Sequence, residues 1–317
     1  MKVNGNKGEG MEKGLLTKIK EIYKNKQNII EYLKNKDNRT QNSFEDIMIS
    51  YDFQAGVYVK NYFKHKDDEV WKKYYDEITQ VIEKYLNHLD HVVLFEAGCG
   101  EATTLVSVCE KLNSKKIKSI YGLDASFSRL MVAKQFSKIK EINVNLIMGD
   151  MMNMPICDGA CDIVFTVHAC EPNGGNEEKI LKELLRITNA YLILFEPAYD
   201  LANEEARRRM EKYGYITKLY DVMCEMGCEI VEHRLLGVNL NNNNPTGITV
   251  IRQNKKKTYE SMILADPISK TPVVQFDDAL WSEESMLLFP RISDISCMCE
   301  GNAIVATKYG KYKDTNI

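Results

Sequence analysis

Two glycines and two carboxylates stand close together in the stretch HVVLFEAGCGEATTLVSV. An apolar run leads into Gly98 and Gly100 and a helical pattern follows, which is how many chains build a pocket for an adenosine-like ligand. A dinucleotide fingerprint requires a third glycine, but the β-branched Thr103 stands at that place. Glu96 and Glu101 flank the turn and would repel a phosphate, whereas they favour a sulfonium or an ammonium group. The stretch therefore predicts a site for a positively charged ligand rather than for a dinucleotide.

The segment FEAGCGEA resembles the E/D-x-G-x-G-x-G signature of class I S-adenosylmethionine-dependent methyltransferases, with Ala102 at the place of the last glycine. Further along, IYGLDAS contains Asp124, 28 residues after Glu96, and is similar to the family's segment whose acid binds both ribose hydroxyls. NLIMGDMMNMP resembles the third signature, which implies that Asp150 accepts from the adenine amine and that Met151 packs on the ring. The resemblance thus implies S-adenosylmethionine as the cofactor.

Residues 50–63, SYDFQAGVYVKNYF, place Tyr51, Gln54 and Tyr58 on one face of a predicted helix. In enzymes that the chain resembles, an N-terminal helix lies over the cofactor as a lid. We therefore expect Tyr51 and Gln54 to contact the substrate and Tyr58 the cofactor, although ordinary core packing would explain the same stripe. The cofactor-binding residues implied by the motifs and the lid are Glu96, Gly98, Gly100, Asp124, Ala125, Asp150, Met151 and Tyr58.

Methyl transfer from a sulfonium mainly requires alignment of the nucleophile with the methyl group, and a base is needed only if the nucleophile must lose a proton. Side chains at the carboxyl ends of parallel strands face the substrate. His168 and Glu171 follow the fourth predicted strand, and His168 is the candidate base because it titrates near neutrality. The alternatives are that His168 caps the strand end and that Glu171 is an ordinary loop acid. Further substrate-binding candidates at the strand ends are Asn173, Glu196 and Tyr199.

From residue 92 onward, short apolar runs alternate with helical patterns. These elements must position the candidate residues. Such alternation is typical of a parallel sheet covered by helices on both faces. After a helix at about 202–225, two apolar runs follow without a helix between them, which indicates a terminal antiparallel hairpin. We therefore expect an α/β fold with a Rossmann-like, seven-stranded, mostly parallel sheet. Its first five strands are predicted at 92–96, 118–123, 144–148, 161–167 and 190–195.

Three regions of different character divide the chain. Helical patterns fill residues 1–90, which we expect to form an N-terminal cap, and residues 91–256 should form the methyltransferase domain. The remaining residues, 257–317, are predicted to be a small β-rich module. Its segments DPISKTPVV and LLFPRISDIS resemble a zinc-ribbon-like domain that activates tRNA, rRNA and release-factor methyltransferases as a separate subunit. Asp266 replaces the cysteine of that domain, so we expect no metal.

Composition and charge narrow the range of partners. The chain has 317 residues and a net charge of −3, which disfavours nucleic acid and an anionic membrane as partners. No apolar run approaches the roughly 20 residues of a membrane span and the N-terminus has no apolar signal core, so a cytoplasmic location is expected. The nine cysteines include no C-x-x-C pair and are expected to be reduced thiols. No feature of the sequence indicates an oligomeric state.

The methyl acceptor is constrained by one turn. Methyltransferases of nucleobases and glutamine amides carry an Asn/Asp-Pro-Pro-aromatic turn after the fourth strand, but HACEPNGG stands here. A small-molecule acceptor methylated on an oxygen or nitrogen atom is therefore the leading interpretation. An RNA or protein substrate, suggested by the terminal module, is the alternative, and a non-catalytic S-adenosylmethionine-binding regulatory protein is the rival from another class.

Replacing Asp124 by alanine should weaken the binding of S-adenosylhomocysteine, because the ribose hydroxyls would lose charge-assisted hydrogen bonds worth roughly 1.5 to 3 kcal/mol. Titration calorimetry of the wild type and of Asp124→Ala measures this loss. An unchanged affinity would contradict the assignment of Asp124 to the ribose.

Overall fold

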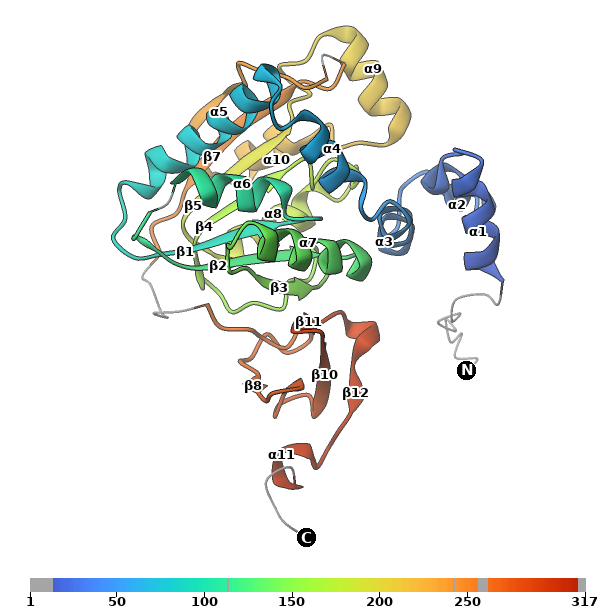
Figure 1. Cartoon of the computed structure of the whole chain (residues 1–317), viewed down its shortest axis with the longest axis vertical. Coiled ribbons are helices and arrows are strands. Elements are labelled where there is room, and N and C mark those ends of the chain that lie inside the picture. The colour runs from blue at the N-terminus through green and yellow to red at the C-terminus, as the bar shows by residue number, and fades with distance from the viewer. Residues whose placement is uncertain (1–13, 113, 242, 256–261, 313–317) are drawn as a thin grey trace.

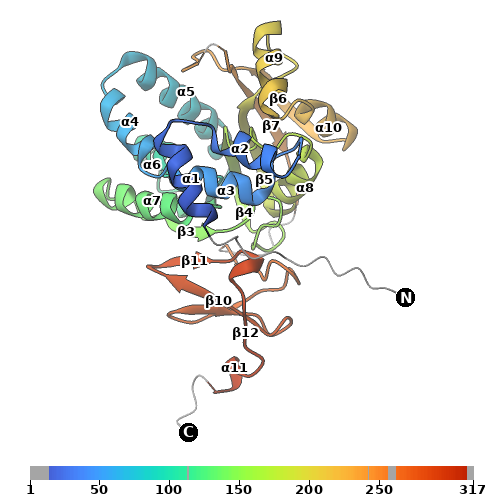
Figure 2. The same cartoon turned by 90° about the vertical axis from the view of Figure 1, so that its right-hand side faces the viewer.

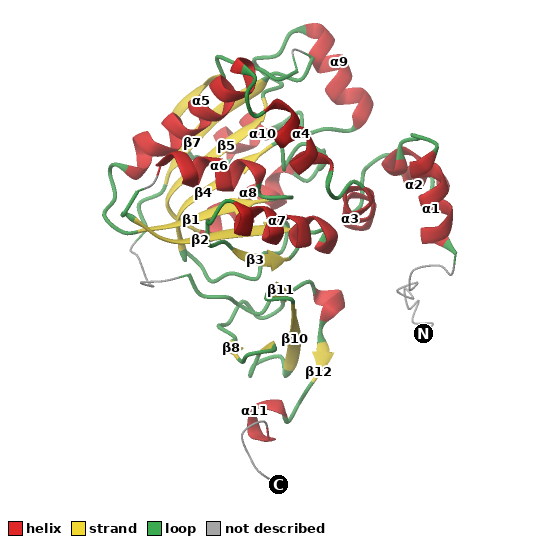
Figure 3. Ribbon diagram, viewed as in Figure 1, coloured by secondary structure: helices red, strands yellow, loops and turns green. Residues whose placement is uncertain are grey.

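The computed structural model describes residues 14–112, 114–241, 243–255 and 262–312 (Figure 1). Helices surround a central sheet (Figure 3), and none of the described helices is long and apolar enough to cross a membrane. In chain order the elements are α1 (Leu15–Lys24), α2 (Ile29–Lys36), α3 (Phe44–Phe53), α4 (Val57–His65), α5 (Glu69–Leu86), β1 (Val92–Ala97), α6 (Thr103–Leu112), β2 (Ile117–Asp124), α7 (Phe127–Ile139), β3 (Asn145–Met148), β4 (Cys161–Val167), α8 (Glu177–Ile187), β5 (Thr188–Pro197), α9 (Glu204–Tyr213), α10 (Leu219–Glu225), β6 (Glu229–Leu235), β7 (Thr246–Arg252), β8 (Val274–Gln275), β9 (Ala279–Trp281), β10 (Leu287–Ile292), β11 (Ile295–Cys297), η1 (Glu300–Asn302), β12 (Ile304–Val305) and α11 (Tyr309–Tyr312).

The central sheet is mostly parallel, as expected. Strands β1 to β5 pair in parallel in the order β5-β4-β1-β2-β3, and β7 lies antiparallel between β5 and β6. The predicted terminal hairpin is therefore confirmed. Because parallel strands end at the same edge of a sheet, the side chains that follow β1 to β5 gather there.

The sheet continues beyond the seven strands that the sequence predicts. Residues 262–312, here called the C-terminal module, contribute β11, which pairs in parallel with β3 so that Ser296 lies opposite Ile147 and Cys297 opposite Met148. Strands β10, β9 and β8 follow outward. The module therefore covers the edge of β3, whose backbone groups would otherwise be open to another chain. The sequence pattern missed this pairing because β11 has only three residues and its partner lies far earlier in the chain.

Side chains of the strands alternate between two cores, one on each face of the sheet. In β1, Leu94 packs in the core formed with α5, α6 and α7, whereas Val93 and Phe95 pack on the opposite face with α8 and α10. All three side chains are at most 1% exposed. Burial on both faces explains why the strands are continuous apolar runs. A separate small cluster that includes Ile19 and Leu33 joins α1, α2 and α3.

The N-terminal helices cover the edge where the strands end. Helices α1 to α5 precede the first strand, and Figure 2 shows α1, α2 and α3 in front of the sheet. Ser43 begins α3 with a capping box, in which the amide of Asp46 donates to the Ser43 hydroxyl and the amide of Ser43 donates to the Asp46 carboxylate. The side-chain amide of Asn42 donates to the carbonyl of Pro172 at 2.6 Å, so the start of α3 is attached to the loop after β4.

Two helical stretches that the sequence predicts as continuous are divided at glycines. The stretch 50–63 consists of α3 and α4, and Gly56 stands between them with a φ of +91°. The stretch 202–225 consists of α9 and α10, and Gly214 ends α9 with a φ of +68°. Glycine adopts this left-handed conformation at low cost. The helix therefore ends near each glycine, although the apolar residues continue at helical spacing.

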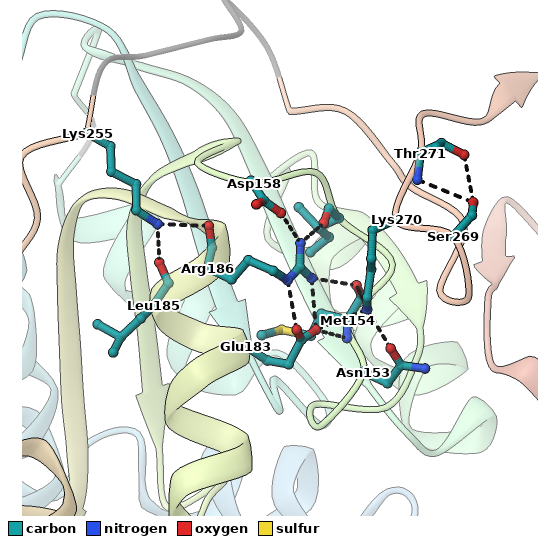
Figure 4. A network of polar contacts seen from close by, with 11 residues as sticks. Asn153, Met154, Asp158, Glu183, Leu185, Arg186, Lys255, Ser269, Lys270 and Thr271 are labelled. Carbon is teal, nitrogen blue, oxygen red and sulfur yellow. Dashed lines mark hydrogen bonds and ion pairs between the residues drawn. The ribbon is translucent and has the colours of Figure 1, made fainter. Parts of the chain in front are cut away.

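Polar contacts join the C-terminal module to the loop that follows β3 (Figure 4). Nζ of Lys270 donates to the carbonyl of Met154 at 3.1 Å and to the carboxylate of Glu183 at 3.2 Å, and it also contacts the side chain of Asn153. Arg186 donates to the same Glu183 carboxylate at 2.7 Å. The loop is therefore held between the module and α8.

Asp266 stands where the resemblance to the zinc-ribbon-like domain places a cysteine. Its carboxylate accepts hydrogen bonds from the hydroxyls of Ser269 (2.9 Å) and Ser282 (2.7 Å) and from the amide of Ile268 (2.9 Å). Burial would raise the pKa of Asp266, but these hydrogen bonds outweigh it and lower the pKa. Among the described residues, no three metal-ligating side chains form a group. The predicted boundary at 256–257 lies outside the described residues.

Replacing Lys270 by methionine should destabilise the protein, because Asn153 and Met154 lose a donor and Glu183 loses one of its two cations. We expect a loss of about 1 to 3 kcal/mol in the free energy of unfolding, measured by urea denaturation. The matched control is Lys308→Met, which removes an exposed lysine of the same module and should change stability by less than about 0.5 kcal/mol. Wild-type stability of Lys270→Met would show that this contact does not hold the loop.

Candidate active site

A cavity opens at the carboxyl ends of the parallel strands, below α3 and α4, which we call the lid. It encloses about 750 Å³ of empty space, including a part that is open to solvent. Its walls come from the lid, α7, the turn after β1, the ends of β2 and β4 and the loops after β3 and β4. The residues that line it are Phe44, Ile47, Met48, Tyr51, Tyr58, Gly98, Leu123, Asp124, Ala125, Arg129, Gly149, Asp150, Met151, Val167, His168, Ala169, Pro172 and Asn173.

The turn after β1 brings the backbone close to the cavity. Gly98 and Gly100 have φ values of +73° and +54°, in the left-handed region that other residues rarely adopt. A Cβ atom on Gly98 would collide with Ala169, and one on Gly100 would collide with the guanidinium of Arg129. Gly98 is therefore required by conformation and by space, whereas Gly100 is required by its conformation, because the end of the Arg129 side chain could move aside.

Asp124 ends β2 beside this turn and lines the cavity. Its Oδ2 accepts a hydrogen bond from the amide of Gly100 and its Oδ1 accepts one from the amide of Ser126, each 2.9 Å long. These bonds fix the carboxylate, while each oxygen keeps a further lone pair for a ligand. Ala125 lines the cavity next to it. The carboxylate can therefore accept hydrogen bonds from two neighbouring hydroxyl groups.

Asp150 and Met151 follow β3 and line the adjoining wall of the cavity. Oδ1 of Asp150 accepts a hydrogen bond from the amide of Met152 at 2.8 Å. Burial raises the pKa of Asp150 above its ordinary value. The loop after β3 thus presents an acceptor and an apolar side chain together, which are the two kinds of contact that an adenine ring can make.

The two carboxylates that flank the turn do not line the cavity, which corrects the electrostatic interpretation of the sequence. Glu96 is 2% exposed, and burial raises its pKa well above the ordinary value, which favours the neutral form. Glu101 is 1% exposed and accepts hydrogen bonds from the amides of Gly56 (2.8 Å) and Val59 (2.7 Å) at the start of α4. Glu96 is part of β1, and the partners of Glu101 lie more than forty residues earlier in the chain, so the motif alone did not show their burial.

A second carboxylate fastens the other half of the lid. Asp52 at the end of α3 accepts hydrogen bonds from the hydroxyl of Ser126 (2.8 Å) and from the amide (3.0 Å) and hydroxyl (2.9 Å) of Ser128 at the start of α7. Together, Asp52 and Glu101 attach the lid to the ends of two neighbouring helices that follow β1 and β2.

Three lid residues have predicted contacts with ligands. Tyr51 and Tyr58 line the cavity. Gln54 does not line it, because its side-chain amide donates to the carbonyl (3.1 Å) and hydroxyl (3.2 Å) of Ser50 one helical turn earlier. The helix ends at Phe53, so the periodicity that grouped Gln54 with the tyrosines does not apply there.

His168 lines the cavity at the end of β4 with a left-handed backbone, φ +51°, of the kind that is common at functional sites. Its Nδ1 lies 2.7 Å from Oε2 of Glu171, and its Nε2 lies 2.7 Å from the hydroxyl of Thr246. Asn244 also donates to Glu171, at 3.0 Å. His168 and Glu171 both follow β4, as the sequence indicates. Thr246 and Asn244 come from the distant hairpin, and no sequence pattern predicted their contact with this pair.

Burial would lower the pKa of His168, but the hydrogen bond and the negative charge of Glu171 outweigh it and raise the pKa above its ordinary value. Burial would likewise raise the pKa of Glu171, yet the bond to His168 lowers it. Each member of the pair therefore stabilises the charged form of the other.

Of the remaining substrate-binding candidates, Asn173 lines the cavity and the other two do not. Glu196 is 3% exposed and accepts hydrogen bonds from the amides of Ala169 (2.9 Å) and Cys170 (3.1 Å). It therefore holds the loop after β4 instead of facing a substrate. Tyr199 stands on the loop before α9, where Arg207 packs over its ring outside the cavity.

Arg129 is a candidate that the sequence analysis missed. It lies on α7, five residues after Asp124, and lines the cavity. It lies in the first turn of the helix that follows β2, and this position beside the strand end was the one available signal. Its guanidinium carbon lies 4.6 Å from the ring centre of Tyr58 and 5.1 Å from that of Tyr51.

Solved structures of similar fold have low sequence identity to this chain. A SAM dependent methyltransferase from Aquifex aeolicus aligns with a TM-score of 0.43 and 16% identity over 60% of this chain and 95% of its own. Magnesium protoporphyrin IX methyltransferase from Synechocystis, crystallised with bound SAH, aligns with a TM-score of 0.42 and 14% identity over 62% of this chain and 98% of its own.

Sequence comparison finds known proteins that are similar to the central part of the chain. Residues 94–190 match a family model described as a methyltransferase domain. Ajmaline N-methyltransferase of Rauvolfia serpentina is 24% identical over 131 residues, which are 40% of this chain and 43% of that enzyme. A demethylmenaquinone methyltransferase of Staphylococcus epidermidis is 30% identical over 144 residues, 45% of this chain and 53% of that enzyme. The chain thus spans about half the length of the curated relatives that it matches. The match to the methyltransferase-domain model covers less than half of this chain.

Replacing Glu101 by alanine should loosen the lid, because the amides at the start of α4 lose bonds worth roughly 1 to 3 kcal/mol each. We expect faster amide hydrogen exchange in residues 56–59 and weaker binding of S-adenosylhomocysteine. Hydrogen exchange read by mass spectrometry measures the first effect. The control is Glu110→Ala on α6, since Glu110 is exposed and bonds only to Lys140 among the described side chains. Wild-type exchange in residues 56–59 of Glu101→Ala would contradict this role.

Proposed function

We propose that this protein is an S-adenosylmethionine-dependent methyltransferase that transfers the methyl group to an oxygen or nitrogen atom of a small-molecule acceptor. The observation that carries the proposal is the junction of the glycine turn with Asp124, made by the 2.9 Å hydrogen bond from the amide of Gly100. Asp150 and Met151 on the adjoining wall add an acceptor and an apolar side chain, as an adenine ring requires.

The described residues fit the cofactor. Asp124 would accept the ribose hydroxyls, Asp150 the adenine amine, and Met151 would pack on the ring. The glycine turn has no side chains of its own at Gly98 and Gly100, and the methionyl part would lie beside it, near Ala169 and the guanidinium of Arg129. When bound, S-adenosylmethionine supplies an electrophilic methyl group on a sulfonium. The lid shields this site from water, which favours alignment of the reacting groups.

The far wall of the cavity favours a compact organic acceptor. Phe44, Ile47 and Met48 of α3 contribute apolar surface, and Pro172 does so from the loop after β4. The net charge of −3 offers no basic field for a polynucleotide. The matched relatives are named for ajmaline and demethylmenaquinone, which are small molecules. These points favour a small acceptor over RNA or protein.

We assign the proton-accepting role to His168, with Glu171 as the residue that positions it. Glu171 bonds Nδ1, so the nitrogen that can exchange its partner for an acceptor is Nε2, now 2.7 Å from the hydroxyl of Thr246. His168 accepts a proton only after it has lost its own, which requires a pH above its raised pKa.

The test is product formation. The purified chain is incubated with methyl-labelled S-adenosylmethionine and with separated small-molecule, RNA and protein fractions of a cytoplasmic extract, since the sequence predicts a cytoplasmic protein. We expect label in a small molecule. Label in RNA or protein would overturn the acceptor class, and tight cofactor binding with no labelled product in any fraction would favour the non-catalytic rival.

Replacing His168 by asparagine, which tolerates a left-handed backbone, should lower turnover roughly 10²- to 10⁴-fold, as the loss of a general base does. Affinity for S-adenosylhomocysteine should stay near the wild-type value. In the wild type the rate should rise with pH through the raised pKa of His168, above the ordinary value near 6.5. In Glu171→Gln this rise should move to lower pH, because the charge that raises the pKa is removed.

The matched control is His233→Asn. His233 also contacts one carboxylate and one threonine hydroxyl, those of Asp200 at 2.7 Å and Thr249 at 2.8 Å, but it lies outside the cavity. It should keep wild-type turnover and pH dependence. Full turnover by His168→Asn would show that His168 only shapes the strand end, and loss of cofactor affinity would move it from catalysis to binding.

A further inference from the structure

Arg129 is a buried cation in the cavity wall that has no anion at hydrogen-bonding distance. The residue is 9% exposed, and its Nη1 lies 3.8 Å from Oδ2 of Asp124, which is too long for a hydrogen bond. Its buried Nε has no hydrogen-bond partner among the described residues. The rings of Tyr51 and Tyr58, at 5.1 and 4.6 Å from the guanidinium carbon, give it cation–π contacts instead.

This arrangement leaves donors available for a ligand. A guanidinium carries five N–H donors in a planar fork that matches a carboxylate, and burying such a group without a partner is costly. Asp124 forms an ion pair with Arg129 but provides no hydrogen bond, because its Oδ2 lies 3.8 Å from Nη1. An anionic group that enters the cavity would complete the site.

The position of Arg129 indicates which anion enters. If adenine lies at Asp150 and the ribose at Asp124, the amino-acid end of the cofactor must lie along the glycine turn. The guanidinium of Arg129 lies directly against Gly100 in that turn, since a Cβ atom on Gly100 would overlap it. Among the residues that line the cavity, Arg129 is the one arginine or lysine.

We propose that Arg129 binds the α-carboxylate of S-adenosylmethionine and, through its contacts with Tyr51 and Tyr58, joins the bound cofactor to the closed lid. This inference rests on the proposed function and adds the residue that recognises the amino-acid end. A carboxylate on the methyl acceptor would be a different ligand for the same cation. His168 and Asn173 line the part of the wall formed by the loop after β4, whereas the guanidinium lies against Gly100, so the cofactor is favoured.

The experiment compares two ligands that differ by one group. Titration calorimetry measures the affinities of S-adenosylmethionine and of decarboxylated S-adenosylmethionine, which keeps the sulfonium and the ammonium but lacks the carboxylate. The proteins are the wild-type full chain, Arg129→Met, Arg129→Lys and Arg209→Met. Arg209 is the matched control, because it also lies over two tyrosine rings, Tyr213 (5.2 Å) and Tyr215 (5.3 Å), and has an unpartnered buried nitrogen, but does not line the cavity.

We expect the wild type and Arg209→Met to bind S-adenosylmethionine roughly 10- to 100-fold more tightly than the decarboxylated ligand, as hydrogen bonds between charged groups imply. Arg129→Met should lose this preference by losing affinity for S-adenosylmethionine alone, and Arg129→Lys should keep part of it.

Equal binding of the two ligands by the wild type would overturn the inference without any variant, even if Arg129→Met fails to fold. An equal loss for both ligands in Arg129→Met would assign Arg129 a structural role. Unchanged ligand affinities in Arg129→Met together with a raised KM for an acidic acceptor would assign it to the acceptor. A wild type that binds neither ligand would contradict the proposed function itself, which is a distinguishable result.

Discussion

The hydrogen bond from the amide of Gly100 to the carboxylate of Asp124 joins the ends of β1 and β2, and the rest of the site is arranged around it. The turn depends on the positive φ angles of Gly98 and Gly100, and a side chain on Gly98 would also collide with Ala169. The bond fixes the carboxylate toward the cavity, between the turn and the loop that carries Asp150. A sheet with parallel strands brings these three segments to one edge, so the fold and the site depend on the same geometry.

Most carboxylates around this junction accept hydrogen bonds from the protein itself. Glu101 receives the first amides of α4, Asp52 receives donors at the start of α7, and Glu196 receives two amides of the loop after β4. These buried or half-buried carboxylates attach the lid and the loops to the sheet. The groups that remain toward the ligand are Asp124 and Asp150, together with Arg129. The cavity is therefore less acidic than the sequence suggests.

The sequence predicts the parts of the fold that depend on local pattern. The parallel strands, the terminal hairpin, the glycine turn and Asp124 follow from apolar runs and residue spacing. Side-chain direction was less predictable, since Glu96, Gln54 and Glu196 stand near the site but point into the protein. Contacts from distant segments could not be predicted at all. Thr246 and β11 reach their partners across more than seventy residues, and no local pattern records such pairings. In the same way, Lys270 joins the C-terminal module to the loop after β3, but no sequence pattern distinguishes it from the other lysines.

A crystal structure of the protein with S-adenosylhomocysteine tests most directly whether the junction of Gly100 and Asp124 is a cofactor site. We expect the adenosine to lie along the edge from Asp124 to Asp150, with both ribose hydroxyls within hydrogen-bonding distance of the Asp124 carboxylate and the lid closed by Asp52 and Glu101. Ligand bound elsewhere, or a ribose turned away from Asp124, would contradict this assignment.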